Sequence, residues 1–278
     1  FSGENEIMDN TIYTLSNHND IYIVECKEEN DSIVYRCKIF DKRIPDESTR
    51  LALRFKELYK DRDILDIGTG TGILLLELYK KYHIQECIGV EINRQRYSLA
   101  VQNMKNNGID KKVKLFCGDY RELDAYYLTN VANIICNPPL IPGEEGFWTE
   151  LDKKASIPMY EYLLHWAKKK IYKPQNGISI LLHVFDYIGV KQRTGDIPSL
   201  IELAEMEGYH LRVLENFQKS VTSKSSIFTK RRQIAEHYPD GRISIENQSF
   251  TILEFSTMGS IKSSKVLLPC SIVEFFCN

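Results

Sequence analysis

Four residues that could perform chemistry follow an apolar run in the middle of the chain. Asn137, Pro138, Pro139 and Leu140 come directly after residues 131–136, which read Val-Ala-Asn-Ile-Ile-Cys and predict a buried strand. Two consecutive prolines fix two φ angles and remove two backbone N–H donors, so the Asn137 side chain and nearby carbonyl groups can accept hydrogen bonds. This rigid turn suits a substrate that brings N–H groups, although Pro-Pro also occurs in ordinary loops.

A glycine-rich turn lies earlier in the chain, between a predicted strand at 63–67 and a predicted helix at 73–82. Its glycines permit positive φ and close backbone approach, so a ligand can lie against main-chain N–H groups. The spacing is G-x-G-x-G, which differs from the G-x-G-x-x-G of dinucleotide-binding turns, and no Gly-Lys-Ser/Thr of a phosphate-binding loop follows. The residues concerned are Asp66, Gly68, Thr69, Gly70 and Gly72.

Two further strands are predicted to end in acidic residues. The strand at 86–92 contains Glu91, which could accept both hydroxyls of a ribose, and a helix at 93–107 follows it. The strand at 113–117 leads to Asp119 and Tyr120, a carboxylate and a ring suited to the exocyclic amine and the face of an adenine. Any one acid could be a solvated loop residue. Four strand ends with such residues predict a ligand site at one edge of an open α/β sheet.

Together these residues resemble the class I S-adenosylmethionine-dependent methyltransferases, in particular the amino-methylating branch with an Asn-Pro-Pro-aromatic motif. The resemblance covers residues 44–186 well and the rest loosely. It implies an α/β, Rossmann-like, doubly wound and mostly parallel seven-stranded sheet, and an enzyme of the EC 2.1.1 type. It also implies S-adenosyl-L-methionine as cofactor and S-adenosyl-L-homocysteine as product.

The resemblance assigns roles to single residues. Residues 44–49 are similar to the Ile-Pro-Arg-Pro-Glu-Thr lead-in of the release-factor glutamine methyltransferases, and they lack its Arg and second Pro. The catalytic turn is Asn137, Pro138, Pro139 and Leu140, and the cofactor-binding residues are Thr49, Asp66, Gly68, Thr69, Gly70, Gly72, Glu91, Ile92, Asp119, Tyr120 and Asn137.

The turn predicts how a nitrogen could be made nucleophilic. An amide or exocyclic nitrogen is a poor nucleophile because its lone pair is delocalised. If the Asn137 oxygen and the Pro138 carbonyl accept its two N–H groups, they favour a tetrahedral nitrogen, and no general base is needed before transfer. Leu140 stands where enzymes that flip a base usually carry an aromatic ring, unless Phe147 or Trp148 replaces it. The loop at 141–148 is either a substrate lid or a surface loop with buried aromatic side chains.

The composition is that of a soluble enzyme, and the net charge provides no overall positive potential that would attract a polyanion. The chain has 278 residues, of which 43% are hydrophobic, and its 36 basic and 38 acidic residues give a formal net charge of −2. No apolar run approaches the roughly 18 residues of a membrane span. We expect the basic runs at 168–170 and 230–232 to be solvated helix faces.

Seven cysteines without a C-x-x-C pair predict reduced thiols, no metal site and a cytoplasmic protein. His165 and His183 fall in a predicted helix and a predicted strand, where packing or a neutral hydrogen bond is the expected use. No secretory signal is evident. Because residue 1 is Phe and Met8 is a plausible start, we expect residues 1–7 to be a cloning remnant.

We predict a β-hairpin extension at 1–43 and a methyltransferase domain at 44–278 that contains a long insertion at 218–247. The insertion should form part of the substrate cover. The hairpin strands are expected at 21–26 and 32–37, around a turn at 27–31. The later part should contain helices at 159–171 and 200–207, and strands at 177–184, 209–214 and 250–255.

Three functions follow from these patterns. We favour an N-methyltransferase for an amine or amide of a small molecule. The alternatives are methylation of a macromolecule, at a protein Gln or an RNA base amine, and non-methyl chemistry with the same cofactor. The acceptor, the number of methyl groups transferred and the oligomeric state stay open.

Overall fold

The structure is a computed structural model, and its backbone is described over most of the chain. The described residues are 6–8, 11–18, 21–28, 31–38, 46–55, 62–82, 86–144, 148–152, 155–191, 194, 197–222, 224–259 and 266–277. Within them, side chains are described from Ser48 onward, except those of residues 49, 53, 80–82, 148–152 and 155–157. The chain divides into two compact units, residues 1–136 and 137–278.

The first unit begins with an antiparallel sheet in sequential strand order. Strands β3 and β4 pair from Ile21↔Lys38 to Glu28↔Asp31, so they form the predicted hairpin with longer strands and a shorter turn than expected. The four strands are β1 (Glu6–Met8), β2 (Thr11–His18), β3 (Ile21–Glu28) and β4 (Asp31–Lys38).

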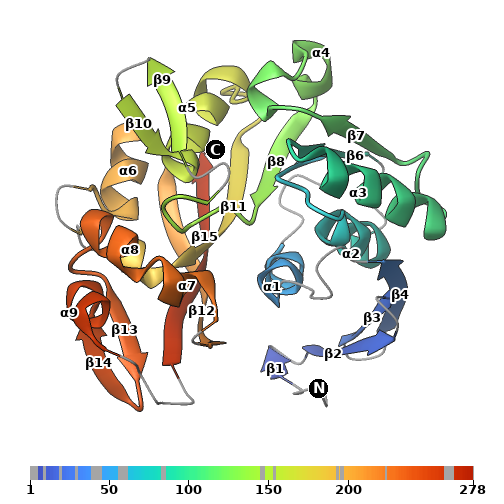
Figure 1. Ribbon diagram of the computed structural model, residues 1–278. Coiled ribbons are helices and arrows are strands. Elements are labelled where there is room, and N and C mark those ends of the chain that lie inside the picture. The colour runs from blue at the N-terminus through green and yellow to red at the C-terminus, as the bar shows by residue number, and fades with distance from the viewer. Residues whose placement is uncertain are drawn as a thin grey trace. The chain divides into compact units, whose positions relative to one another are not determined.

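A parallel sheet in the order β7-β6-β5-β8 follows in the same unit. Every residue of β6 and β8 is buried, as expected for parallel strands that are covered on both faces. Helix α2 contacts β6, and α3 contacts β6 and β7 (Figure 1). The elements are α1 (Asp46–Arg54), β5 (Asp63–Ile67), α2 (Ile73–Tyr82), β6 (Cys87–Glu91), α3 (Arg94–Asn106), β7 (Val113–Cys117), η1 (Tyr120–Glu122), α4 (Ala125–Leu128) and β8 (Val131–Cys136).

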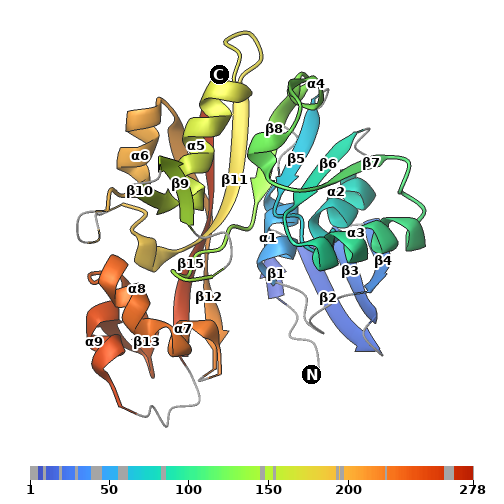
Figure 2. The same ribbon diagram turned by 45° about the horizontal axis from the view of Figure 1, so that its top comes forward.

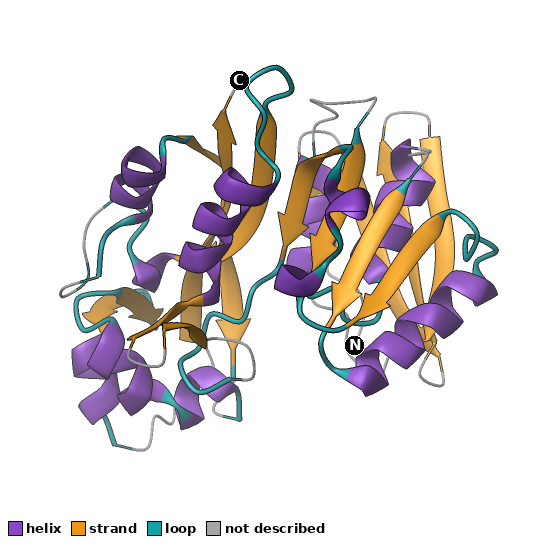
Figure 3. Cartoon of the chain, turned by 90° about the horizontal axis from the view of Figure 1, so that it is seen from above, coloured by secondary structure: helices purple, strands orange, loops and turns teal. Residues whose placement is uncertain are grey.

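The second unit holds an antiparallel sheet around a long C-terminal strand. Strand β15 pairs with β11, β12 and β13, and β13 also pairs with β14. Helix α6 contacts α5 and β12, and α8 contacts α7 and α9 (Figure 2). Figure 3 shows the helices in purple and the strands in orange. The elements are β9 (Trp148–Asp152), β10 (Ala155–Pro158), α5 (Met159–Lys170), β11 (Ile178–Phe185), η2 (Asp186–Ile188), α6 (Leu200–Glu207), β12 (His210–Val221), α7 (Ser226–Thr229), α8 (Arg231–His237), β13 (Arg242–Ile245), β14 (Gln248–Thr251), α9 (Ile252–Thr257) and β15 (Val266–Cys277).

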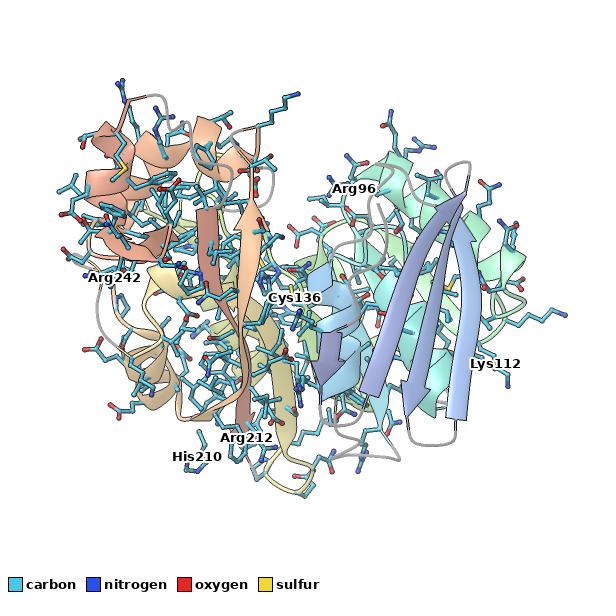
Figure 4. All side chains as sticks on the ribbon, turned by 90° about the horizontal axis from the view of Figure 1, so that it is seen from below. Arg96, Lys112, Cys136, His210, Arg212 and Arg242 are labelled. Carbon is cyan, nitrogen blue, oxygen red and sulfur yellow. The ribbon has the colours of Figure 1, made fainter. Side chains whose placement is uncertain are left out.

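A polar triad around the buried carboxylate of Glu274 crosses the three long strands of this second sheet. Glu274 on β15 is 1% exposed, accepts a 2.7 Å hydrogen bond from the Ser179 hydroxyl of β11, and pairs with the Arg212 guanidinium of β12. Figure 4 labels Arg212. Because a buried carboxylate needs partners for its oxygens, this triad fixes which residues of β11 and β12 lie opposite Glu274.

The predicted closing strand at 250–255 is wrong. Residues 252–257 form helix α9, because Thr251 and Glu254 make a capping box that favours a helix start. Thr251 Oγ1 accepts from the Glu254 N–H, and Glu254 Oε2 accepts from the Thr251 N–H. The last strand along the chain is β15, which lies inside the sheet and pairs with β11, β12 and β13. The predicted strand at 209–214 is the first half of β12, which continues to Val221.

The α/β, Rossmann-like fold is confirmed, whereas the strand number of seven and the domain limits stay predictions. In the described part of the chain no helix has both the length and the apolar character needed to cross a membrane. The described cysteines are all free thiols, and only Cys117 among them is exposed. Burial raises the pKa of Cys87 to about 12 and that of Cys136 well above its ordinary value.

Candidate active site

The glycine-rich turn begins directly after β5 and contains three glycines with positive φ. These angles are +74° at Gly68, +57° at Gly70 and +81° at Gly72. A Cβ added at Gly68 would meet no atom within 4 Å, and one at Gly70 would meet only the Gly68 carbonyl at 3.9 Å. At Gly72 it would lie 2.3 Å from Met104 Cε on α3. The first two glycines therefore leave room for a ligand, and the third permits close helix packing.

Two buried polar side chains hold this turn. Thr69 Oγ1 donates a 2.6 Å hydrogen bond to Asp66 Oδ2, and Asn103 Nδ2 on α3 donates a 2.8 Å bond to the Thr71 carbonyl. Burial, and to a smaller extent the charge of Glu91, raise the pKa of Asp66 to about 7, although the bond from Thr69 opposes the rise. Asn103 was not predicted from the sequence, and it is marked in the structure as a fully buried polar residue on the helix next to the turn.

Glu91 ends β6 and is only 4% exposed. The Gly70 N–H donates to Glu91 Oε2 and the Asn93 N–H donates to Oε1, both at 2.8 Å. Each carboxylate oxygen has a further lone pair that could accept a ribose hydroxyl. The two N–H groups thus fix the orientation of the carboxylate beside the glycine-rich turn.

The predicted adenine contacts differ in exposure. Ile92 is 57% exposed and offers an apolar surface, whereas Tyr120 is 8% exposed and contributes its ring to the core. Asp119 caps η1 and pairs with the Arg121 guanidinium. Burial raises the pKa of Asp119, but the hydrogen bonds and charge of Arg121 outweigh it and lower the pKa overall. Thr49 lies on α1, and its side chain is outside the described residues.

The acceptor turn follows β8 without interruption. Strands β5 and β8 end in register, with Ile67 opposite Cys136, so the strand that leads into Gly68 and the strand that leads into Asn137 stop at the same level. Figure 4 labels Cys136, the last residue of β8. The prediction of a ligand site at one edge of the sheet needs these two strands to end at the same level, as they do.

In the second unit, Asn137 is clamped by a histidine. Asn137 Oδ1 lies 3.0 Å from His183 Nδ1 on β11. The His183 side chain is 2% exposed, and its ring meets Phe185 edge-on at 5.1 Å and Phe217 at 5.9 Å. With its hydrogen on Nδ1, the imidazole donates to the amide oxygen and leaves that oxygen a second lone pair. The predicted neutral hydrogen bond of His183 therefore involves the proposed catalytic side chain.

Two more bonds hold the carbonyl groups that follow. The Tyr187 hydroxyl donates to the Leu140 carbonyl, and Lys230 Nζ donates to the Gly143 carbonyl, both at 2.8 Å. Leu140 is itself 2% exposed, so its side chain is buried. Pro138 is buried and Pro139 half-buried. The turn is thus a rigid backbone platform. Phe147 lies outside the described residues, as does the side chain of Trp148, so the lid prediction stays open.

The first unit offers a glycine-rich, acid-flanked surface after β5 and β6, and the second unit begins with oriented oxygen acceptors. The described residues hold no group of three or more His, Cys, Asp or Glu placed for a metal ion, and the predicted absence of a metal stays a prediction.

Known proteins match this part of the chain. Residues 31–155 match the family model of the methyltransferase small domain. A protein-lysine N-methyltransferase from Saccharolobus islandicus is 26% identical over 142 residues, which cover 48% of this chain and 83% of that protein. A tRNA1(Val) (adenine(37)-N6)-methyltransferase from Vibrio vulnificus is 24% identical over 162 residues. That match covers 57% of this chain and 62% of the tRNA enzyme, which is less than two thirds of its length.

The crystal structure of the YcgJ protein from Bacillus subtilis has a TM-score of 0.50 and 13% identity over 84% of this chain and 98% of that chain, a likeness of fold alone. The named relatives act on a protein and on tRNA. They do not support our preference for a small-molecule acceptor and agree better with the macromolecular alternative.

Proposed function

Because the chain belongs to the class I S-adenosylmethionine-dependent methyltransferases of the amino-methylating type, we propose that it transfers a methyl group to a nitrogen of a macromolecule. The observation that carries this proposal is the Asn137 amide, held by His183 at the start of a rigid turn that follows β8. The names of the two relatives favour a protein or RNA acceptor over a small amine.

The residues of the first unit fit the cofactor. Open space lies over Gly68 and Gly70, the Glu91 carboxylate is oriented by two N–H groups, and Ile92 is exposed. Glu91 would hold the ribose, Ile92 would cover the adenine, and Asp119 would accept from the adenine amine. When bound, S-adenosylmethionine supplies an electrophilic methyl group on a sulfonium.

Asn137 and Pro138 act on the acceptor nitrogen. The Asn137 side-chain oxygen and the Pro138 carbonyl accept its two N–H groups, which favours a tetrahedral nitrogen with a localised lone pair. These acceptors interact most strongly when positive charge grows on the nitrogen, so they stabilise the transition state more than the ground state. After transfer the nitrogen carries the methyl group, both protons and a positive charge. One of the two protons then leaves to water, because such an ammonium is strongly acidic when its nitrogen is attached to a carbonyl or an aromatic ring.

His183 acts through Asn137 and is a positioning residue. A side-chain amide can flip by about 180°, so that its oxygen and its NH2 group exchange positions. A donor at Nδ1 of His183 favours the orientation in which the oxygen remains the acceptor for the substrate. Burial of the ring between Phe185 and Phe217 keeps that donor in place.

Methyl transfer from labelled S-adenosylmethionine to total tRNA and to a ribosomal protein mixture tests the proposal. Asn137→Ala should lower the transfer rate by about 100- to 1,000-fold, the usual effect of removing one transition-state acceptor or donor. Its affinity for S-adenosylhomocysteine, measured by calorimetry, should stay within a factor of about two. That is a small change in binding free energy, since about 1.4 kcal/mol is needed for a tenfold change in Kd. Full activity of the variant, or no transfer to either acceptor class by the unchanged protein, would contradict the proposal.

A further inference from the structure

Residues 216–235 concentrate positive charge. They contain five Lys or Arg residues and no Asp or Glu, in a chain whose acidic residues outnumber its basic ones by 38 to 36. We call this stretch the basic segment. It runs from β12 through α7 into α8. Its charged residues are Lys219, Lys224, Lys230, Arg231 and Arg232.

Most of these charges lack an acidic partner. Within the part of the chain that the structure describes, Lys224, Lys230, Arg231 and Arg232 form no ion pair. Lys224 and Arg232 are exposed. Lys224 lies two residues before helix α7, and Lys230 directly follows its last residue, Thr229. Like charges on one short stretch of chain repel one another, and an anionic partner would relieve that repulsion.

The basic segment is hydrogen-bonded to the loop that follows the acceptor turn. Lys230 was expected on a solvated helix face, but its ammonium group lies 2.8 Å from the Gly143 carbonyl, six residues after Asn137. Gln233, one turn further along α8, is a second neighbour, since a Cβ added at Gly143 would lie 3.3 Å from its Oε1. Both residues belong to the same unit as the turn. A polyanion on this segment would therefore lie beside the loop that follows the acceptor turn.

Exposed hydroxyl groups accompany the charges. Ser220 and Thr222 are both exposed and lie at and just after the end of β12. Lys and Arg together with Ser and Thr are the side chains that contact phosphate oxygens in nucleic-acid complexes. A phosphodiester backbone carries one charge per nucleotide at regular intervals and matches a row of separate cations better than a single acidic side chain does.

We propose that the basic segment binds the phosphate backbone of an RNA acceptor. This inference rests on the proposed function and names the substrate class for the same site. Electrostatic contacts of this kind position the substrate and carry little sequence information, so the base that is methylated would be selected elsewhere.

Binding of a fluorescein-labelled RNA hairpin to the full chain, followed by fluorescence anisotropy without cofactor, tests the proposal. The variant Lys224→Gln/Arg232→Gln removes two exposed charges of the basic segment, and the control Lys169→Gln/Lys170→Gln removes two exposed charges at the end of α5. Each phosphate contact contributes a slope of about −0.7 in a plot of log affinity against log salt. At about 0.1 M salt that slope corresponds to roughly fivefold per contact.

We therefore expect the basic-segment variant to bind roughly 25-fold more weakly at about 0.1 M salt, with a slope smaller by about 1.4, and the control to bind like the unchanged protein. Equal losses in both variants, or no loss in either, would overturn the proposal. So would methylation of a protein acceptor whose rate the basic-segment variant leaves unchanged, and in that case the proposed function would stand. Charge-dependent RNA binding without methyl transfer to any acceptor would instead support the surface and refute the proposed function.

Discussion

Replacing His183 by phenylalanine removes one hydrogen-bond donor and keeps a ring of similar size between Phe185 and Phe217. The bond it removes is the 3.0 Å contact with Asn137 Oδ1, which is shielded because His183 is 2% exposed. A typical protein hydrogen bond contributes about 0.5–1.5 kcal/mol net. If that energy is used to orient the amide, the methyl-transfer step should slow by roughly 2- to 13-fold. Loss of the Asn137 acceptor itself should be far more severe.

The assay is single-turnover methyl transfer at saturating cofactor, because this rate reports the chemical step and not product release. Affinity for S-adenosylhomocysteine and the urea midpoint are measured in parallel. His183→Gln keeps an N–H donor and should recover part of the rate. His165→Phe is the matched control, since His165 is exposed on α5 and contacts only Glu207 among the partners that the structure gives it.

An unchanged single-turnover rate in His183→Phe would refute the positioning role. Two other outcomes would show that the ring matters for packing and not for the orientation of Asn137. One is a similar loss of rate in His165→Phe. The other is a lower urea midpoint together with no recovery of the rate in His183→Gln.

Three further predictions concern stability and the cofactor surface. The folded state binds the Asp66 proton more tightly than the unfolded chain does, so stability is lost as pH rises from 3.8 to about 7. In urea titrations, the free energy of unfolding of Asp66→Asn should therefore exceed that of the unchanged protein by up to about 4 kcal/mol at pH 8. At pH 4 the difference should be far smaller. Gly72→Ala should lower that free energy by about 2–4 kcal/mol, because its Cβ meets Met104 and its φ is positive; Gly68→Ala, with open space around it, should lose less stability and more cofactor affinity in calorimetry. Tyr187→Phe leaves a buried carbonyl of the acceptor turn unpaired and should cost about 1–3 kcal/mol in the same titrations, without a change in cofactor affinity. If Asp66→Asn and the unchanged protein differ in unfolding free energy by the same amount at pH 4 and pH 8, the first prediction is contradicted. If Gly72→Ala or Tyr187→Phe is as stable as the unchanged protein, the corresponding prediction is contradicted.

The strands of the first unit were predictable because their apolar runs are short and are bounded by glycine or acidic turns. The strands β5, β7 and β8 have the predicted limits, and β6 is one residue shorter at each end. Local pattern sufficed there, since a buried parallel strand is apolar along its whole length.

The end of the chain was less predictable. Residues 250–255 have the composition of a strand, and the capping box at Thr251 and Glu254 decides for a helix. Strand β15 contains Pro269, which argues against a central strand. The ladder with β11 ends at Cys270, one residue after it, whereas the ladder with β12 continues past Pro269 to Val266.

The candidate site was predictable only in part. The glycine-rich turn and Glu91 follow from local motifs, whereas the bond between Asn137 and His183 joins residues 46 positions apart. No local pattern reports such a contact. The buried side chain of Leu140 was missed for the same reason, because its environment comes from packing with distant parts of the chain.

The exposed thiol of Cys117 gives this protein a natural labelling site. It ends β7, two residues before Asp119, while Cys87, Cys136, Cys270 and Cys277 are buried. A maleimide dye would therefore react first at Cys117 among the described cysteines, and substitution of Cys26 and Cys37 by serine would remove the two whose side chains are not described. The attached dye would lie beside the residue proposed to hold the adenine, so its fluorescence would report cofactor binding directly.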